Sequence, residues 1–156
     1  MTPSRQIEDH AAWLGVIPLS SLYTAGRGGQ IFFDALKRYG KLIGTRCGSC
    51  KQVYLPARSF CERCFAELTE QVAVKSMGRL VSYTLCYVGR DHKPLHRPQA
   101  LALVQLDRAT TPMLHYLLGV TDPDQARIGS KVEVIIKPKR RRAGSILDIE
   151  GFRIVK

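Results

Sequence analysis

Four cysteines in two closely spaced pairs constrain this chain more than any other feature of its sequence. Cys47 and Cys50 form the first Cys-x-x-Cys pair, and Cys61 and Cys64 form the second pair ten residues later. Zinc takes four sulfur or nitrogen ligands at tetrahedral corners, and two such pairs supply all four. Paired Cys-x-x-Cys motifs in a cytosolic chain indicate metal ligands sooner than disulfides. The spacing therefore predicts a zinc ribbon, with residues 52–56 forming its hairpin arm.

Four cysteine ligands would fill every coordination position of a zinc ion. A catalytic zinc keeps one position open for water or substrate, so a four-thiolate site is structural. A redox Cys-x-x-Cys is expected near a βαβ pattern, and none follows here. The fifth cysteine, Cys86, falls on a predicted strand and is interpreted as a buried, inert thiol. We expect one structural zinc ion per chain and no metal catalysis.

The chain divides into three predicted zones, with the cysteines in the second. Residues 1–45 form a helical N-terminal segment, residues 46–68 form the ribbon, and residues 69–156 form an all-β domain. A segment as short as the first zone cannot build its own core, so it must pack on the rest of the chain or on a partner.

The N-terminal zone shows two apolar patterns with helical spacing. The first consists of Ile7, Ala11 and Leu14, and the second runs through residues 31–39 to a C-terminal cap at Gly40. A glycine-containing loop is expected between them, marked by Gly26, Gly28 and Gly29. The zone therefore predicts more than one helix.

The third zone alternates apolar and polar residues with the period of β-strands. Five strands are predicted, at residues 80–88, 100–106, 117–120, 131–136 and 146–154. Five strands in one small domain suit an OB-fold barrel, and periodicity leaves an SH3-like barrel open. In the first strand, Tyr83 and Tyr87 alternate with Val81 and Leu85, which favours a place in the core over a base-stacking surface.

The chain is strongly basic, with 24 Lys and Arg against 13 Asp and Glu and a formal charge of +11. Such a charge favours nucleic acid, an acidic protein face or a phosphorylated small molecule, without selecting among them, and a solvated basic surface is the alternative. The densest cluster lies in a predicted hairpin loop before the last strand. Because Arg and Lys bind phosphates, its candidate anion-binding residues are Lys137, Lys139, Arg140, Arg141 and Arg142.

No constellation of side chains in the sequence indicates catalysis. The carboxylates show no acid/base pair, and no histidine is placed to activate Cys86. His92 and His96 are flanked by prolines and are expected in a loop, and His115 is interpreted as structural. We therefore expect that the chain is not an enzyme.

No targeting or membrane segment is expected. There is no run of about 18 apolar residues that could span a bilayer. The first ten residues are polar and of mixed charge, unlike a secretory signal. The protein is therefore expected to be cytoplasmic, with no membrane contact.

The order of several short motifs resembles a known family. These motifs are FFDALK (32–37), GKLIGTRCGSC (40–50), YLPAR (54–58), the second cysteine pair, GRLVSYT (78–84), ALVQLD (102–107) and IGSKVEV (128–134). Together they resemble the zinc-ribbon plus OB-fold proteins, of the domain of unknown function 35 type, that accompany thiolases and related acyl-CoA enzymes. The resemblance covers roughly residues 30–136.

The resemblance implies a mainly β fold, with N-terminal helices, a rubredoxin-like zinc ribbon and a five-stranded OB-fold barrel. It also implies a non-catalytic accessory subunit that binds CoA or acyl-CoA and docks onto a thiolase-like or HMG-CoA-synthase-like enzyme. The phosphates of CoA suit a basic surface. The basic cluster at residues 137–142 departs from the family pattern and keeps open a second hypothesis, a single-stranded nucleic-acid-binding protein.

Overall fold

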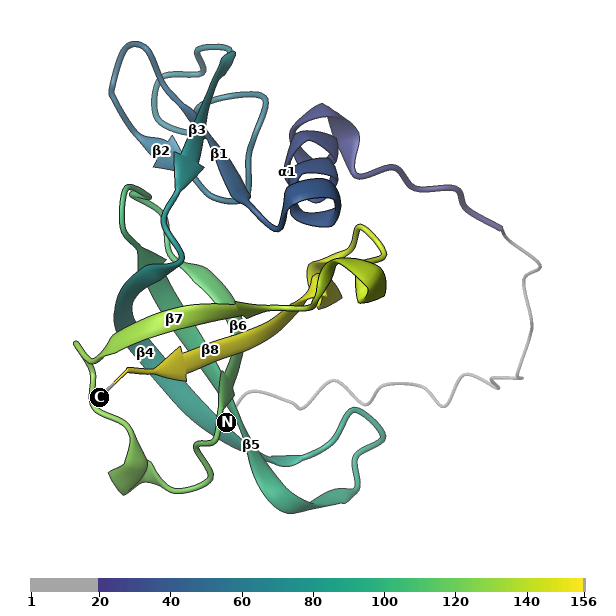
Figure 1. Ribbon diagram of the computed structural model, residues 1–156, viewed down its shortest axis with the longest axis vertical. Coiled ribbons are helices and arrows are strands. Elements are labelled where there is room, and N and C mark those ends of the chain that lie inside the picture. The colour runs from purple at the N-terminus through teal and green to yellow at the C-terminus, as the bar shows by residue number, and fades with distance from the viewer. Residues whose placement is uncertain (1–19, 156) are drawn as a thin grey trace, which may run out of the picture.

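The computed structural model describes residues 20–155, which form one α-helix, a small sheet and a closed barrel (Figure 1). The mainly β prediction is confirmed. The elements, in chain order, are α1 (Gly26–Tyr39), β1 (Leu42–Arg46), β2 (Val53–Tyr54), β3 (Glu70–Val74), β4 (Met77–Val88), β5 (Pro94–Leu106), β6 (Met113–Leu118), η1 (Pro123–Gln125), β7 (Lys131–Ile136), η2 (Lys139–Arg141), η3 (Ile146–Asp148) and β8 (Ile149–Ile154). Within these residues, no helix has the length and apolar character needed to cross a bilayer.

Helix α1 is the one α-helix in residues 20–155, and it contains the second of the two predicted helical patterns. The helical pattern at Ile7, Ala11 and Leu14 lies outside the described residues. Helix α1 ends as predicted at Gly40, which has a left-handed φ of 64° and donates its N–H to the Leu36 carbonyl at 2.9 Å. Such a C-cap satisfies carbonyls that the helix leaves unpaired.

The glycines expected in a loop instead form the first turn of α1. Gly28 is buried, and a Cβ at this position would lie 2.7 Å from the Ala57 carbonyl oxygen and 2.8 Å from Arg58 Cα. Glycine at this position therefore allows the helix to approach the ribbon backbone closely. The sequence around Gly28 does not distinguish this role from that of a glycine in a loop.

The ribbon sheet has the strand order β2-β1-β3, with both pairs antiparallel. Thr45 in the central strand pairs with Tyr54 on one side and Gln71 on the other. The sheet runs from Leu42 to Val74 and so extends past residues 46–68 at both ends. Only two residues separate β3 from β4, which ties the ribbon closely to the barrel.

The barrel closes in the order β4-β5-β6-β8-β7, and β7 pairs back onto β4. Strand β8 lies between β6 and β7, parallel to β6 and antiparallel to β7. This connectivity is that of the OB-fold rather than of an SH3-like barrel, so the tertiary pairing settles the alternative that periodicity left open.

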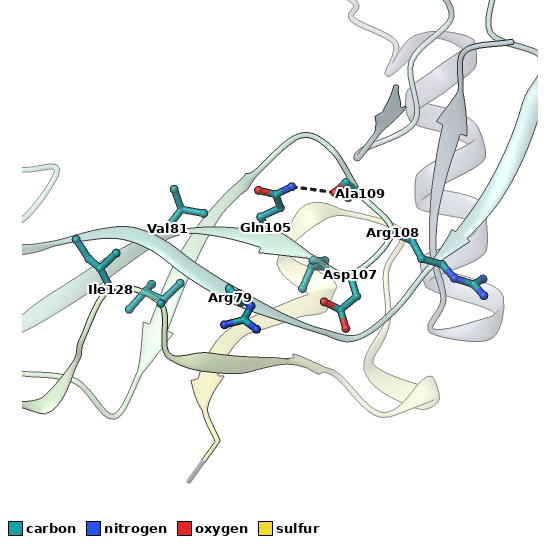
Figure 2. A pocket seen from close by; sticks show the side chains of 10 residues that line it. Arg79, Val81, Gln105, Asp107, Arg108, Ala109 and Ile128 are labelled. Atoms are coloured by element: carbon teal, nitrogen blue, oxygen red, sulfur yellow. Dashed lines mark hydrogen bonds between the residues drawn. The ribbon is translucent and has the colours of Figure 1, made fainter. Parts of the chain in front are cut away.

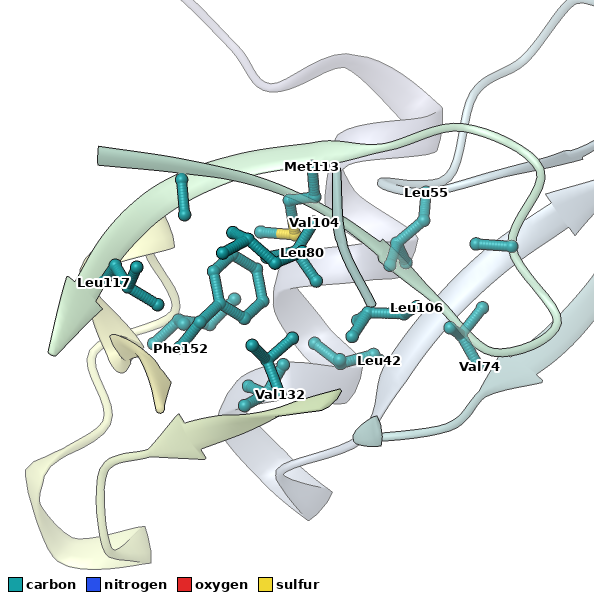
Figure 3. Packing of buried hydrophobic residues seen from close by; sticks show 14 of the residues in the cluster. Leu42, Leu55, Val74, Leu80, Val104, Leu106, Met113, Leu117, Val132 and Phe152 are labelled. Atoms are coloured by element: carbon teal, nitrogen blue, oxygen red, sulfur yellow. The ribbon is translucent and has the colours of Figure 1, made fainter. Parts of the chain in front are cut away.

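One hydrophobic core runs through all three parts of the molecule. Leu80, Val132 and Phe152 fill the barrel, and each is at most 1% exposed (Figure 3). Phe32 and Leu36 of α1 belong to the same cluster and are fully buried. The helix and the ribbon therefore sit on the open end of the barrel as parts of one packed body.

Strand β4 departs from the predicted apolar face. Tyr83 and Leu85 pack against the core as expected, but Val81 is 40% exposed and Tyr87 is 58% exposed. A register shift between Leu80 and Ser82 explains the difference for Val81, because one extra residue turns the following side chains to the opposite face.

Gly28→Ala should lower the free energy of unfolding by about 1–3 kcal/mol, since the added methyl group meets backbone that cannot turn aside. Helix propensity alone would predict the opposite sign, a gain of up to about 1 kcal/mol. Urea unfolding followed by circular dichroism would measure the change. Gln30→Ala, on the exposed side of the same helix, is the control, and an unfolding free energy that rises in Gly28→Ala would contradict the packing argument.

Candidate functional site

The two Cys-x-x-Cys turns adopt the same backbone geometry. In the first, the Lys51 N–H donates to the Cys47 carbonyl at 3.0 Å, and in the second the Phe65 N–H donates to the Cys61 carbonyl at 2.9 Å. Lys51 and Phe65 both have left-handed backbones, with φ of 62° and 58°. Each turn therefore reverses the chain directly after its second cysteine and directs two sulfur atoms to one side.

All four predicted ligand residues are brought together by these turns. The four Sγ atoms lie within 4.8 Å of one another, with Cys47 and Cys64 at 3.5 Å and Cys50 and Cys61 at 3.4 Å. A tetrahedral zinc ion with Zn–S bonds of about 2.3 Å separates its sulfurs by about 3.8 Å. The donor set therefore fits a closed tetrahedral site, and four-sulfur sites suit zinc or iron.

A buried tyrosine tunes one of the sulfurs. Tyr54 is fully buried on β2, and its hydroxyl lies 3.2 Å from Cys61 Sγ. With the phenol as donor, this hydrogen bond lowers the pKa of Cys61 to about 6. The same hydrogen bond, together with burial, raises the pKa of Tyr54 to about 12. Sequence reasoning missed Tyr54, although its place in the arm between the cysteine pairs is a usable signal.

The four sulfurs do not ionise equally. The Cys50 N–H donates to Cys47 Sγ at 3.4 Å and lowers the pKa of Cys47. The Ala66 N–H would lower the pKa of Cys64, but the Cys47 and Cys61 sulfurs and burial raise it to about 11. Four thiolates at this spacing repel one another, and a divalent cation would remove that repulsion, because a coordinated thiol is deprotonated outright.

Thr45 and Arg58 hold the second cysteine turn against the ribbon sheet. The fully buried Thr45 hydroxyl donates to the Arg58 carbonyl and accepts the Arg58 N–H, both at 2.9 Å. The Arg58 guanidinium lies over the Tyr54 ring at 5.2 Å, a cation–π contact. These contacts orient the residues that surround the metal ligands, and such outer hydrogen bonds fix the ligand geometry in metal sites.

The predicted basic loop connects β7 to β8 and contains two short 3₁₀ turns, η2 and η3. Arg142 is engaged in structure: its Nε donates to the Lys137 carbonyl at 2.7 Å, and its guanidinium lies against Gly40. A cation at this position also favours the C-terminal end of α1. Lys139, Arg140 and Arg141 remain exposed. The five candidate anion-binding residues therefore do not form one uniform cluster.

Asp148 organises this loop and was missed by sequence reasoning. It is 1% exposed, and its carboxylate accepts the N–H groups of Ala143 at 2.8 Å and Gly144 at 2.7 Å. Burial acts to raise the pKa of Asp148, but these hydrogen bonds and that from Ser145, with the charge of Lys137, outweigh it and lower the pKa. The loop is thus built around a buried, ionised carboxylate.

The remaining candidate residues do not converge. Among residues 20–155, the four cysteines are the one group of three or more His, Cys, Asp or Glu that could share a metal ion. His115, which was interpreted as structural, is buried on β6, with Nε2 3.3 Å from the Ile146 carbonyl oxygen, and burial lowers its pKa. His96 lies on β5 rather than in the predicted loop, while His92 lies in a turn, and Cys86 is half-buried.

A cavity of about 530 Å³ opens on the barrel surface beside β4 and β5 (Figure 2). Val81 and Ile128 provide apolar walls, and Arg79, Asp107 and Arg108 provide charge. The carboxylate of Asp107 weakens the attraction of this cavity for anions. The cavity therefore suits a mixed apolar and polar contact better than a phosphate.

Two family models match consecutive parts of the chain. The ChsH2 rubredoxin-like zinc ribbon domain matches residues 34–70, and the ChsH2 C-terminal OB-fold domain matches residues 71–137. The chain belongs to the ChsH2 (DUF35) family. This confirms the resemblance found in the sequence, and the shared boundary falls within β3.

Curated relatives and solved structures agree with this assignment. The chain is 27% identical over 121 residues to a DUF35 domain-containing scaffold protein of Methanothermobacter thermautotrophicus, covering 75% of this chain and 86% of the relative. It is 26% identical over 97 residues to a protein of the same name from Methanocaldococcus jannaschii, covering 62% and 67%.

Among solved structures, a DUF35-family protein of unknown function from Sulfolobus solfataricus matches with a TM-score of 0.62 and 27% identity, covering 83% of this chain and 84% of that one. A chain of the Ltp2-ChsH2(DUF35) aldolase matches with a TM-score of 0.60 and 24% identity, covering 83% and 95%. The second likeness supports the fold alone.

Purified, tag-free protein should contain one zinc ion per chain by elemental analysis. Cys61→Ser should lose the metal, while Cys86→Ser, which alters the cysteine outside the cluster, should keep it. Removing the metal with a chelator should lower the midpoint of thermal unfolding, because metal binding stabilises only the folded ribbon. Protein with neither zinc nor iron would contradict the site, and iron in place of zinc would contradict the metal.

Asp148→Asn should lower the free energy of unfolding at pH 7 by about 1–3 kcal/mol, because an amide replaces a charged acceptor of buried N–H groups. Since the pKa of Asp148 is lowered by folding, its ionised form contributes stability above the ordinary aspartate pKa of about 4 and loses it as the pH falls through the folded value. The stability difference from wild type, measured by urea unfolding from pH 7 downward, should shrink at acidic pH. A difference independent of pH would contradict the role of the charge.

Proposed function

We propose that this chain is a non-catalytic accessory subunit that binds acyl-CoA and docks onto a thiolase-type or HMG-CoA-synthase-type enzyme. The observation that carries the proposal is family membership together with the naming of the relatives as scaffold proteins. A scaffold role needs a rigid body with surfaces for partners, and it needs no reactive group of its own.

The chemistry of the cysteine cluster supports an accessory role. A metal held by four cysteines has no open position for water or substrate, so it cannot act as a Lewis acid toward a ligand. The four sulfurs lie in the ribbon, and none of the residues that line the 530 Å³ cavity on the barrel belongs to the ribbon. The metal centre thus serves to shape the ribbon.

Exposed aromatic side chains on the second cysteine turn support docking through the ribbon. Phe65 is 81% exposed and Phe60 is 62% exposed, and Phe65 holds a left-handed backbone that an asparagine or glycine adopts more easily. Aromatic residues are enriched where protein interfaces form. We assign these two side chains to the enzyme-facing surface.

The positive charge of the chain supports the proposed binding of acyl-CoA. CoA carries a 3′-phosphate and a diphosphate, and Arg and Lys side chains bind such groups through charge-assisted hydrogen bonds. The net charge of +11 raises the local concentration of any anionic ligand. The acyl group itself is left to the partner enzyme.

Single-stranded nucleic acid remains the second candidate, favoured by the same charge and by the exposed Lys139, Arg140 and Arg141. OB-folds bind oligonucleotides on the face of their second and third strands, where aromatic side chains stack on bases. Here the outward residues of β5 and β6 pair as Leu103 with Leu114 and Leu101 with Tyr116. A face with one aromatic residue and three leucines suits protein contact better than base stacking.

Affinity-tagged protein expressed in its native host should retain a thiolase-type or HMG-CoA-synthase-type enzyme in stoichiometric amount, identified by mass spectrometry. Phe65→Asn should reduce the retained enzyme at least about tenfold, because an exposed aromatic anchor contributes on the order of 2 kcal/mol to an interface. Asparagine keeps the left-handed backbone, so the metal content should not change. Val88→Asn, which removes an exposed apolar side chain from strand β4 of the barrel, is the matched control.

The proposed function fails if no acyl-CoA enzyme is retained and CoA does not bind. If Phe65→Asn retains the enzyme at the wild-type level, docking through the second cysteine turn is contradicted, and the accessory role itself is not. Binding of a single-stranded oligonucleotide with a steep salt dependence, in the absence of any retained enzyme, would favour the second candidate.

A further inference from the structure

A groove of about 430 Å³ lies where the ribbon meets the barrel, and we call it the junction groove. Three cationic residues line it: Arg46 at the end of β1, Lys51 after the first cysteine pair, and Arg108 in the turn after β5. Its other lining residues are small or apolar and include no carboxylate: Val53, Val72, Ala73 and Thr110. Cations from three separate segments thus meet around one apolar-walled space.

The walls of the junction groove are fixed to one another by hydrogen bonds. The Thr110 hydroxyl accepts the Val53 N–H at 2.8 Å and lies 3.0 Å from the Val53 carbonyl oxygen, which also accepts the Thr110 N–H at 2.9 Å. The Leu55 N–H donates to the Thr111 hydroxyl at 2.9 Å. These bonds clamp the ribbon arm to the barrel, so the groove exists before any ligand binds and ordering it costs little.

Two of the three cations occupy backbone positions that other residues adopt more easily. Lys51 has a φ of 62° and Arg108 a φ of 76°, in the left-handed region where glycine and asparagine are favoured. Figure 2 shows the Arg108 side chain extending away from Val81 and Ile128, toward the ribbon. The choice of long cations at two strained turns points to a use for their side chains.

Most of the positive charge in the junction groove is uncompensated. Arg46 has a carboxylate partner, Glu70, at 3.6 Å. Lys51 donates to the neutral Gly48 carbonyl, which leaves its charge in place. Within residues 20–155, neither Lys51 nor Arg108 forms an ion pair. The groove is therefore a stronger anion site than the 530 Å³ cavity, which contains Asp107.

We propose that the junction groove binds the phosphate groups of a phosphorylated nucleoside, with Lys51 and Arg108 as its principal contacts. The apolar walls formed by Val53 and Val72 would pack against the nucleoside, and the volume falls in the range of ordinary small-ligand sites. This inference rests on the proposed function, since CoA carries a phosphorylated adenosine. It places ligand phosphates here rather than on the basic loop at residues 137–142.

Isothermal titration calorimetry with adenosine 3′,5′-bisphosphate, the phosphorylated nucleoside of CoA, tests the inference on the full chain. The double variant Lys51→Asn/Arg108→Asn removes both charges while keeping residues that favour the left-handed backbone. The double variant Arg140→Asn/Arg141→Asn removes the same charge from the exposed loop. Arg108→Asn alone, remote in sequence from the cysteines, serves if the double variant loses metal.

The groove variant should bind the bisphosphate at least about tenfold more weakly, because each charge-assisted hydrogen bond to phosphate is worth about tenfold or more. The loop variant should lose less than about threefold, since it changes only the long-range attraction. Adenosine without phosphate should bind far more weakly to the wild-type protein. This pattern would support the assignment.

Equal losses in both double variants, or a larger loss in the loop variant, would overturn the inference in favour of general attraction or the loop. Failure of the wild-type chain to bind the bisphosphate at millimolar concentration would also overturn it. Tighter binding of single-stranded oligothymidylate, lost in the same groove variant, would replace the small ligand with nucleic acid. Retention of the partner enzyme by the groove variant is measured separately, so the scaffold proposal can stand when the groove assignment fails.

Discussion

A continuous hydrophobic core determines how the three parts of this protein relate to one another. Phe32 and Leu36 of helix α1 and Leu42 of the ribbon belong to the same cluster as Leu80 and Phe152 of the barrel. Neither the helix nor the ribbon encloses enough apolar surface to stand alone, and each covers its apolar side by packing on the barrel. Because protein cores are close-packed and hardly compressible, this packing fixes the distance between the cysteine turns and the barrel surface.

The cysteine cluster acts locally, at the tip of the ribbon. Cys47, Tyr54, Cys61 and Leu68 form a separate, small buried cluster, too small to fold the ribbon tip by apolar burial alone. Four convergent sulfurs supply what that cluster lacks, because a metal ion crosslinks the two cysteine turns. Tyr54 belongs to both the apolar cluster and the cysteine site: its ring is buried in the ribbon, and its hydroxyl lies beside the Cys61 sulfur. A closed site of this kind shapes a surface and leaves no coordination position open for water or substrate.

Positive charge is distributed differently in the fold and in the sequence. The densest basic run in the sequence is partly structural, because Arg142 supports the end of α1 and the loop is held by the buried Asp148 carboxylate. Lys51 and Arg108 are separated by more than fifty residues and form no run in the sequence. The junction between ribbon and barrel brings them together, and the apolar residues around them make a concave site rather than a solvated patch.

The sequence by itself determined the local elements of this protein, namely the metal ribbon, the strands and the end of the helix. The two cysteine pairs specify a metal ribbon because ligand chemistry and spacing are local, and the alternating apolar residues specify strands because side chains alternate across a strand. The Gly40 cap follows from a left-handed position that glycine fills best. Only the tertiary structure decided that Gly28 lies in a helix against the ribbon, that β8 inserts between β6 and β7, and that Lys51 and Arg108 line one groove. These features depend on contacts between segments far apart in the chain, and such contacts leave no periodic or local signal for a single sequence to show.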